Sequence, residues 1–329
     1  MRWIVITSIN YPTESVRRIG GLGNGWQPVL VADRKTPADW AQEGFRFLSV
    51  EEQARLGLTL GNRLPFNTYS RKNLGYLLAL REGAEVIAET DDDNRPYEHF
   101  LRDVSPTVMG QRVTSPGWVN IYRLFTEKRV WPRGLPLEAV NASFHSLPAT
   151  EAFGEHDCPI QQYLADGDPD VDAVYRLTQE QEVLFGQGSY VLAPGCFCPF
   201  NSQNTIWYPP AFPLMYLPSH VSFRMTDIWR SFVAQVCLRA QGSSLAFHGP
   251  TVYQERNEHS LLRDFQDEVP GYLNNTRLME LLSGLSLGSG DTKADLRLCY
   301  TALVDAGIVP AEELNLVDAW LTDLQQLGL

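Results

Sequence analysis

The sequence predicts an α/β fold, in which a central sheet flanked by helices is followed by a helical C-terminal region. Two observations lead to this prediction. In the first third of the chain, continuous apolar runs of strand length are separated by a helical segment, and beyond residue 227 apolar residues recur every three or four positions. Uninterrupted apolar runs are typical of strands buried on both faces of a parallel sheet, so we expect such a sheet near the N-terminus.

Three strands and one helix are predicted up to residue 90. The strands cover residues 3–9, 28–32 and 84–90. The helix covers residues 69–82, and Gly83 follows it as a residue that readily takes the left-handed conformation found after helices. The glycine-rich segment 20–25 lacks the spacing of a dinucleotide-binding fingerprint, and we expect no helix there.

The rest of the chain divides into an irregular middle part and a helical end. Residues 95–225 are rich in proline and aromatic residues, with short strands expected at 189–194 and 214–217. An amphipathic helix over 227–240 and a short strand over 245–248 follow. Further helices are expected over residues 258–269, 277–282, 294–305 and 311–327. We therefore predict an α/β domain over residues 1–255 and a helical region over 256–329. The apolar stripe of that region is expected to pack on the main domain, with a homodimer contact or an acceptor platform as the alternatives.

Composition excludes several classes of partner. The chain has 329 residues, and its 27 Lys and Arg against 39 Asp and Glu give a formal charge of −12. Because it has no basic block, nucleic acid and anionic membranes are disfavoured as partners. No apolar stretch reaches the ~18 residues that span a bilayer, and no signal-peptide pattern is seen, so we expect a cytoplasmic protein. The five cysteines form no C-x-x-C pair and are expected to be reduced packing residues.

Three consecutive carboxylates, Asp91, Asp92 and Asp93, directly follow the third apolar strand. Ligands bind at the carboxyl ends of strands in open α/β sheets, and a divalent cation commonly neutralises adjacent carboxylates there. Magnesium and manganese take few protein carboxylates and fill their other positions with water and phosphate oxygens. The triplet therefore predicts a site for Mg²⁺ or Mn²⁺ and a nucleoside diphosphate. The alternative is an acidic surface loop without a ligand.

Two further segments favour nucleotide binding. The first strand ends at Thr7, Ile9 and Asn10, where small polar side chains and backbone amides suit a base and ribose. The second is followed by Asp33, which can accept hydrogen bonds from a uracil imide or a ribose, and by Lys35, which can face phosphate. An ordinary turn before Pro37 is the alternative.

Arg71, Lys72 and Asn73 lie at the start of the predicted helix 69–82. The positive end of a helix dipole disfavours cations, so a bound diphosphate would explain them. A solvated helix face is the alternative.

These segments together resemble the STELLO-type glycosyltransferase family. The motifs are Thr7-Ser-Ile-Asn10, Val31-Ala-Asp33-Arg-Lys35, Arg71-Lys-Asn73-Leu-Gly75-Tyr76 and Asp91-Asp-Asp93-Asn94, with later stretches at 201–205, 226–230 and 254–264. More distantly the chain is similar to the reversibly glycosylated polypeptides, which are UDP-arabinopyranose mutases. The resemblance reaches about residue 275. It implies a GT-A fold, a Rossmann-like mixed sheet flanked by helices, with a metal site at Asp91 and Asp93. Asp92 and Gly75 fall within the motifs of its nucleotide-sugar site.

The same resemblance suggests catalytic residues. In inverting GT-A enzymes a carboxylate at the start of a helix beside the acceptor commonly acts as general base, and Asp227 has that place. Its alternative role is an N-cap. Trp229 is expected to stack on a sugar, and Arg230 to contact phosphate or acceptor, unless it is a surface arginine. His259 is expected to join the metal site, although a structural role is open. Asn201, Gln203 and Asn204 are candidates for reading sugar hydroxyls.

The predicted function is therefore a metal-dependent transfer of a sugar from a UDP-sugar to a carbohydrate acceptor. A nucleotide-sugar mutase and a non-catalytic nucleotide-sugar-binding protein are the alternatives. A mutase acts on the sugar nucleotide alone, without a second substrate. Slow hydrolysis of the donor would favour an enzyme over a binding protein. The chain shows no G-x-S-x-G, H-E-x-x-H or Walker motif, which disfavours the common hydrolase, zinc-protease and P-loop classes.

Overall fold

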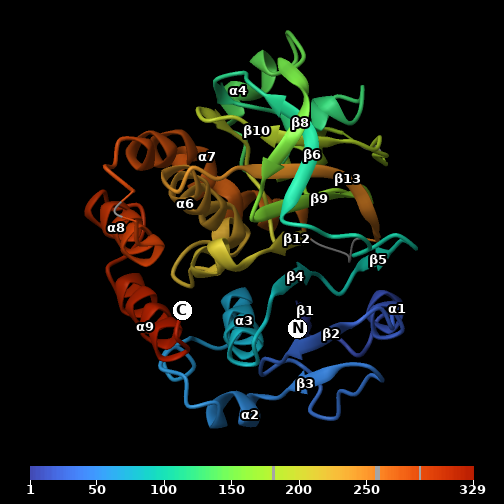
Figure 1. The fold of residues 1–329 in the computed structure, drawn as a ribbon, viewed down its shortest axis with the longest axis vertical. Coiled ribbons are helices and arrows are strands. Elements are labelled where there is room, and N and C mark those ends of the chain that lie inside the picture. Colours follow the sequence, from blue (N-terminus) through green and yellow to red (C-terminus); the bar gives the residue numbers. More distant parts are fainter. Residues whose placement is uncertain (180–181, 256–259, 289) are drawn as a thin grey trace.

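The computed structural model describes residues 1–179, 182–255, 260–288 and 290–329. Its main feature is a mixed sheet with the strand order β3-β2-β1-β4-β12-β9-β13-β10-β6-β8, to which β5 adds beside β13 (Figure 1). The strands are β1 (Arg2–Thr7), β2 (Trp26–Val31), β3 (Arg46–Leu48), β4 (Val86–Thr90), β5 (Asn94–Pro96), β6 (Thr107–Val113), β8 (Thr150–Asp157), β9 (Ile160–Gly167), β10 (Ser189–Leu192), β12 (Asn204–Trp207) and β13 (Leu245–Gln254). Strands β7 (Gly117–Trp118) and β11 (Cys196–Phe197) pair separately.

Helices cover both faces of the sheet. They are α1 (Glu14–Gly20), α2 (Val50–Arg55), α3 (Lys72–Arg81), α4 (Leu137–Ala142), α5 (Ala173–Thr178), α6 (Thr226–Ala240), α7 (Leu261–Ser283), α8 (Thr292–Asp305) and α9 (Glu312–Gln326). Short 3₁₀ turns lie at η1 (Tyr69–Arg71), η2 (Ile121–Leu124), η3 (Pro209–Met215) and η4 (Phe223–Met225). The predicted α/β class with C-terminal helices is confirmed.

The two faces of β1 contribute to two separate cores. Trp3 and Val5 belong to the larger core, which includes apolar residues of α3, α6 and the C-terminal helices. Ile4 and Ile6 belong to a smaller core with Val16 and Ile19 of α1. Because successive side chains of a strand point to opposite faces, a continuously apolar β1 is what two buried faces require.

Several predicted elements are confirmed and others are corrected. The helix predicted over 227–240 is α6, and Gly83 and Gly242 have positive φ after α3 and α6. The two helices predicted over 258–269 and 277–282 belong to one helix, α7, although residues 256–259 lie outside the described ranges. The strand predicted over 214–217 is wrong, because the proline-rich segment forms η3 instead.

The expectation of no helix between the first two strands is also wrong. The seven-residue α1 lies there, and Thr13 caps its N-terminus by accepting a hydrogen bond from the Val16 amide. The helix ends at Gly20, so the glycine-rich segment follows this helix rather than opening one. Too short to show a helical repeat, α1 is missed by periodicity alone.

Two buried carboxylates of the C-terminal helix α9 accept hydrogen bonds from segments in both halves of the chain. Glu313, fully buried, accepts hydrogen bonds from the Tyr216 hydroxyl, from the amides of Ser219 and His220 and from the His220 ring. Asp323, also buried, accepts hydrogen bonds from the amides of Thr59 and Leu60. Buried polar contacts thus connect the helical region to the sheet domain. The domain boundary predicted at residue 255 stays a prediction.

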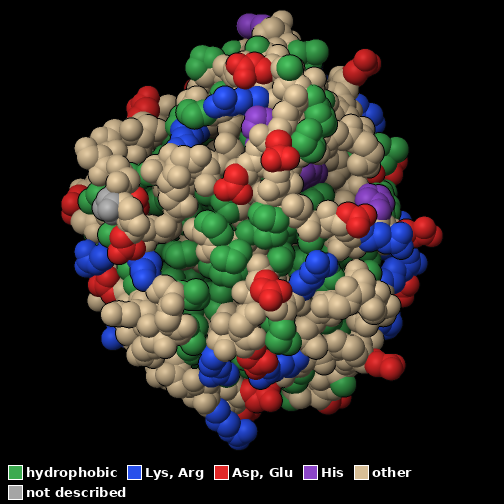
Figure 2. Space-filling view, in the orientation of Figure 1, with side chains coloured by type: hydrophobic (Ala, Val, Ile, Leu, Met, Phe, Trp, Pro, Cys, Tyr) green, Lys and Arg blue, Asp and Glu red, His purple; other side chains and the backbone are tan. Residues whose placement is uncertain are grey.

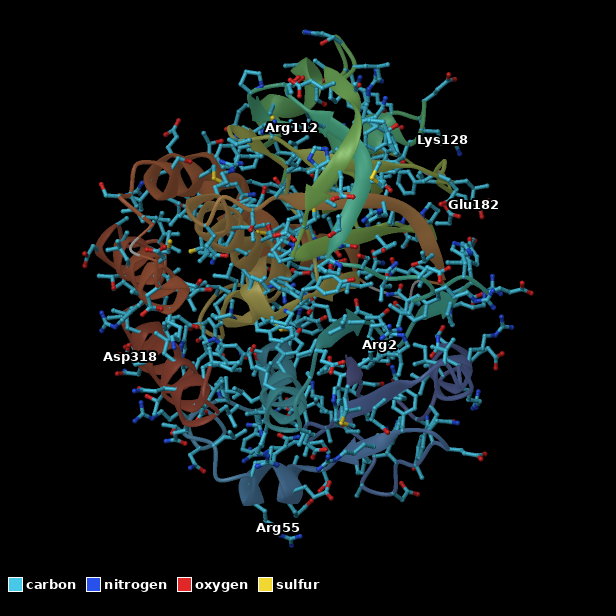
Figure 3. All side chains as sticks on the ribbon, in the orientation of Figure 1. Arg2, Arg55, Arg112, Lys128, Glu182 and Asp318 are labelled. Atoms are coloured by element: carbon cyan, nitrogen blue, oxygen red, sulfur yellow. The ribbon has the colours of Figure 1, made fainter. Side chains whose placement is uncertain are left out.

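Apolar and charged side chains occupy different parts of the face shown in Figure 2. In Figure 2, apolar side chains gather in the middle of the face shown, and charged side chains lie mostly around its rim. Charged residues such as Arg55 on α2 and Asp318 on α9 lie at the periphery (Figure 3). All five cysteines are free and buried, as predicted. Within the described ranges, no helix combines the length and the apolarity needed to cross a bilayer.

Candidate functional site

Several strands of the sheet, β1, β2, β4, β9 and β13 among them, point their carboxyl ends to the same edge. Strands β2 and β4 are both parallel to β1, and β12 is antiparallel to both β4 and β9. Strand β9 therefore runs with β4, and β13 is parallel to β9. The segments that follow β1, β2, β4, β9 and β13 meet at this edge, together with the segment that precedes β12. Ligand sites of α/β sheets are found at such edges.

The acidic turn, defined as Asp91, Asp92 and Asp93, lies at this edge and contacts three different elements. Asp92 accepts hydrogen bonds from Ser8 and, at 3.1 Å, from the Asn10 side-chain amide after β1. Asp93 Oδ2 accepts one from Gln254 at the end of β13, at 3.3 Å.

Asp91 Oδ1 accepts a hydrogen bond from the Tyr69 hydroxyl at 2.8 Å and lies 3.4 Å from Lys72 Nζ. The three carboxylates therefore connect three separate elements at one place.

Burial and mutual repulsion disfavour negative charge in the acidic turn. Burial raises the pKa of Asp91, against the lowering effect of Lys72 and the Tyr69 hydroxyl. Burial, together with the charges of Asp91 and Asp92, raises the pKa of Asp93 to about 7. The carboxylates of the turn and the hydroxyls of Ser8 and Tyr69 that contact them carry hard oxygen donors, which Mg²⁺ and Mn²⁺ prefer.

The chemistry of these donors fits a cation that uses few protein ligands. Over the described ranges, no group of three or more His, Cys, Asp and Glu side chains is arranged to hold a metal ion. A cation at Asp91 and Asp93 would therefore take most of its oxygen ligands from water and substrate, as Mg²⁺ commonly does. His259, the predicted third ligand, lies outside the described residues.

The ends of β1 and β2 form a joined surface beside the acidic turn. The Thr36 hydroxyl donates to the Ser8 carbonyl at 2.6 Å. Asp33 accepts hydrogen bonds from the amides of Arg34, at 2.7 Å, and Thr68, at 3.1 Å. The predicted nucleotide-binding residues at these strand ends are Thr7, Ile9, Asn10, Asp33 and Lys35. Asp33 is half-buried, and Ile9, Asn10 and Lys35 are exposed.

The predicted diphosphate contacts in η1 and at the start of α3 are not accessible. Arg71 is buried, donates to Gln53 and to the Leu64 carbonyl, and stacks on Phe66. Asn73 exchanges two hydrogen bonds of 2.9 Å with the backbone of Leu217.

Gly75 faces the sheet, where an added Cβ would lie 2.5 Å from Val5 and Val31. This geometry argues against phosphate contacts and assigns Arg71, Asn73 and Gly75 to packing.

Asp227 lies in a buried ion cluster that sequence reasoning missed. Arg133 binds Asp227 through Nη1 and Nη2 at 3.0 and 2.9 Å, and binds Asp170 through Nε and Nη2 at 2.7 and 2.9 Å. Burial alone would raise the pKa of Asp227, but the Arg133 guanidinium outweighs it and lowers this pKa to about 2. The Asp227 side chain does not cap α6, and its low pKa argues against general base catalysis.

Arg230 and Trp229, which follow Asp227 in the first turns of α6, are also buried and bonded within the protein. Arg230 forms a bidentate ion pair with Glu89 of β4, at 3.0 and 2.7 Å, with the two side chains 1% and 0% exposed. Trp229 is buried and donates its indole N–H to Asn275 at 2.9 Å. Neither the predicted phosphate contact of Arg230 nor sugar stacking by Trp229 agrees with this burial.

Polar residues just before β12 and at its first position lie beside the site. Asn201, Gln203 and Asn204 are buried and bonded within the protein. Asn201 donates to Asp170 at 2.8 Å, and Gln203 donates to Gln254. Sugar hydroxyls would have to displace these contacts, so this geometry favours a supporting role.

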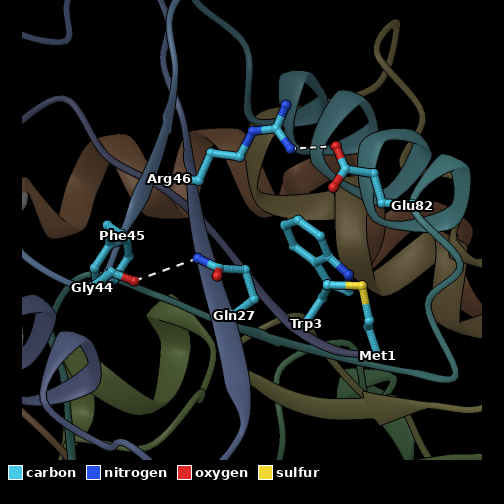
Figure 4. Close-up of a pocket in the computed structure, with 7 residues that line it drawn as sticks. All are labelled: Met1, Trp3, Gln27, Gly44, Phe45, Arg46 and Glu82. Atoms are coloured by element: carbon cyan, nitrogen blue, oxygen red, sulfur yellow. Dashed lines mark hydrogen bonds and ion pairs between the residues drawn. The ribbon is translucent and has the colours of Figure 1, made fainter.

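The residues that sequence reasoning missed are Tyr69, Arg133, Asp170, Ser202 and Gln254. One usable signal was present, because carboxylates alternate at residues 166, 168, 170 and 172, where β9 ends. A pocket of about 360 Å³ lies at the opposite edge of the sheet, lined by Trp3, Gln27, Arg46 and Glu82 among others (Figure 4). It is remote from the acidic turn, since it adjoins the amino ends of β1 and β2.

Comparison with known proteins identifies relatives along the whole chain. A family model for STELLO glycosyltransferases matches residues 224–329, which include α6 to α9. The probable glycosyltransferase STELLO1 of Arabidopsis thaliana is 32% identical over 348 residues, and STELLO2 of the same plant is 31% identical over 354 residues. Each alignment covers 99% of this chain and 44% or 45% of the plant protein, so the chain spans less than half the length of these relatives.

Proposed function

Because the chain belongs to the STELLO glycosyltransferase family, we propose that it transfers a sugar from a nucleoside diphosphate donor, a UDP-sugar, to a carbohydrate acceptor with the help of a divalent cation. The observation that carries this proposal is the acidic turn at the carboxyl edge of the sheet. It lies between the surface formed by β1 and β2 and the buried polar segment before β12.

The nucleoside and the diphosphate of the donor each find suitable groups at this edge. Asp33 and Asn10 offer acceptors and donors for a nucleoside, and the exposed Arg34 and Lys35 can face phosphate. Asp91 and Asp93 would hold Mn²⁺ or Mg²⁺, which supplies charge stabilisation to the departing diphosphate. With a net charge of −12, the protein depends on such local positive charge to attract an anionic donor.

We expect Asp93→Asn to raise the dissociation constant of UDP in the presence of Mn²⁺ at least tenfold while the protein stays folded. The substitution removes a cation ligand without changing side-chain size. Isothermal titration calorimetry with UDP, with and without Mn²⁺, measures the effect, and Asp305→Asn on the exposed surface of α8 is the matched control. Unchanged metal-dependent binding in Asp93→Asn contradicts the proposal.

Chromatography of the donor incubated alone distinguishes the transferase from its rivals. A transferase releases free sugar and UDP slowly, because water replaces the acceptor. A mutase returns a ring isomer of the donor, and a binding protein returns the donor unchanged.

Phe223 is the aromatic residue we expect the acceptor to contact, in place of Trp229. It is 58% exposed, and its ring centroid lies 6.1 Å from that of Tyr69, which binds Asp91. Phe223→Ala should raise the acceptor KM roughly three- to tenfold, as expected for the loss of one ring contact of about 1 kcal/mol. The KM of the donor should not change. Phe265→Ala, at another exposed ring, should alter neither KM.

A further inference from the structure

Tyr69 joins the acidic turn to the buried ion cluster around Arg133. We infer that Tyr69 is the positioning residue that orients Asp91 for cation binding, that Ser202 competes with Asp91 for the Tyr69 proton, and that Asp227 competes with Tyr69 for the Ser202 proton. The inference rests on the proposed function, because it takes Asp91 as a carboxylate that holds the cation.

The Tyr69 hydroxyl has three polar neighbours. It lies 2.8 Å from Asp91 Oδ1, 2.7 Å from Ser202 Oγ and 2.8 Å from Lys72 Nζ. The Lys72 side chain is fully buried and also donates to the Thr90 carbonyl at 3.0 Å. A phenol has one proton to donate, and an ammonium group only donates, so Lys72 occupies one acceptor position of the hydroxyl.

Because each hydroxyl has one proton to donate, the hydrogen bonds of Tyr69 and Ser202 can take two arrangements. In the first, Tyr69 donates to Asp91 and accepts from Ser202. In the second, Tyr69 donates to Ser202, and Ser202 donates to Asp227 Oδ2 at 3.2 Å. Ser202 has one hydroxyl proton, so it cannot serve Tyr69 and Asp227 at once.

The two arrangements differ in what holds Asp91. In the first, Tyr69 and Lys72 both bind Asp91 Oδ1 and fix the orientation of the carboxylate. In the second, only Lys72, at 3.4 Å, remains of these two donors. Because partners of a ligand set its orientation, their removal typically weakens metal binding 10- to 100-fold.

This competition gives the two hydroxyls opposite roles. Tyr69→Phe removes the donor to Asp91 in either arrangement and should weaken cation binding. Ser202→Ala removes the competing acceptor, so the Tyr69 proton goes to Asp91, while the Ser202 backbone amide still binds Asp227 at 3.2 Å. Cation binding in Ser202→Ala should therefore be preserved.

The test measures Mn²⁺ binding directly, by electron paramagnetic resonance of the free ion, in buffer and with UDP. We expect the dissociation constant of Mn²⁺ to rise about tenfold or more in Tyr69→Phe and to stay within twofold in Ser202→Ala. Tyr97→Phe is the matched control, because Tyr97 donates a similar hydrogen bond of 2.9 Å to Asp166 at the end of β9. It should also stay within twofold.

Each other outcome overturns the inference in a recognisable way. Wild-type affinity in Tyr69→Phe shows that the phenol does not position Asp91, and leaves the proposed function standing. If Ser202→Ala weakens Mn²⁺ binding as much as Tyr69→Phe does, Ser202 does not compete with Asp91 for the Tyr69 proton. If circular dichroism shows that Tyr69→Phe is unfolded, the Tyr69 hydroxyl is needed for folding rather than for positioning Asp91. Absence of Mn²⁺ binding by the wild type rejects the metal site itself.

Discussion

Replacing Arg230 with methionine should lower the free energy of unfolding by about 3–5 kcal/mol, the usual result of removing one partner from a buried ion pair. The substitution leaves the buried Glu89 side chain without its counter-charge. Tyr76 and Trp207 still donate hydrogen bonds to Glu89, but they bring no positive charge. Urea unfolding followed by circular dichroism measures the loss.

Two further variants separate this structural role from a catalytic one. Removing both charges, in Glu89→Gln with Arg230→Met, should recover part of the stability, because no unpaired buried charge remains. Arg297→Met is the matched control, since its pair with Asp318 is about half exposed and should be worth less than about 1 kcal/mol. If Arg230→Met loses sugar transfer but less than about 1 kcal/mol of stability, Arg230 acts in the chemistry instead.

What the sequence predicts well is local. The apolar run of β1 has two buried faces because alternate residues enter two cores. The apolar spacing of 227–240 correctly predicts the helix α6, although residues 226–238 of this helix are all buried. The acidic turn is equally local, since its three carboxylates directly follow β4. By contrast, the antiparallel β12 lies between the parallel strands β4 and β9, which no local pattern reports.

What the sequence predicts poorly depends on distant partners. Arg230 looks like a ligand-binding cation until Glu89, 141 residues away, is placed beside it. Arg71 is explained by Gln53 and Phe66 rather than by phosphate. Arg133 gave no signal, because its partners Asp170 and Asp227 follow 37 and 94 residues later. A charge is assigned to chemistry or to structure only after its counter-charge is known.

Asp227→Asn should cost about 2 kcal/mol of stability at neutral pH and should leave sugar transfer within about tenfold of the wild type. The pKa of the Asp227 carboxyl in the folded protein is about 2, against an ordinary value of 3.8. A carboxyl with a lowered pKa stabilises the fold above its ordinary pKa, and this stabilisation is lost as the pH falls through the folded value. The stability difference between wild type and variant should therefore shrink between about pH 4 and pH 2.

Urea unfolding of both proteins from neutral pH downward, with donor hydrolysis and sugar transfer assayed on the same samples, checks this expectation. A general base works best when its pKa lies near the working pH, and its removal typically costs 10²- to 10⁴-fold in rate. A carboxylate held by Arg133 at 3.0 and 2.9 Å is poorly suited to take a proton. A rate loss above a hundredfold with an unchanged unfolding curve contradicts the structural role, because it makes Asp227 the base despite its ion pair.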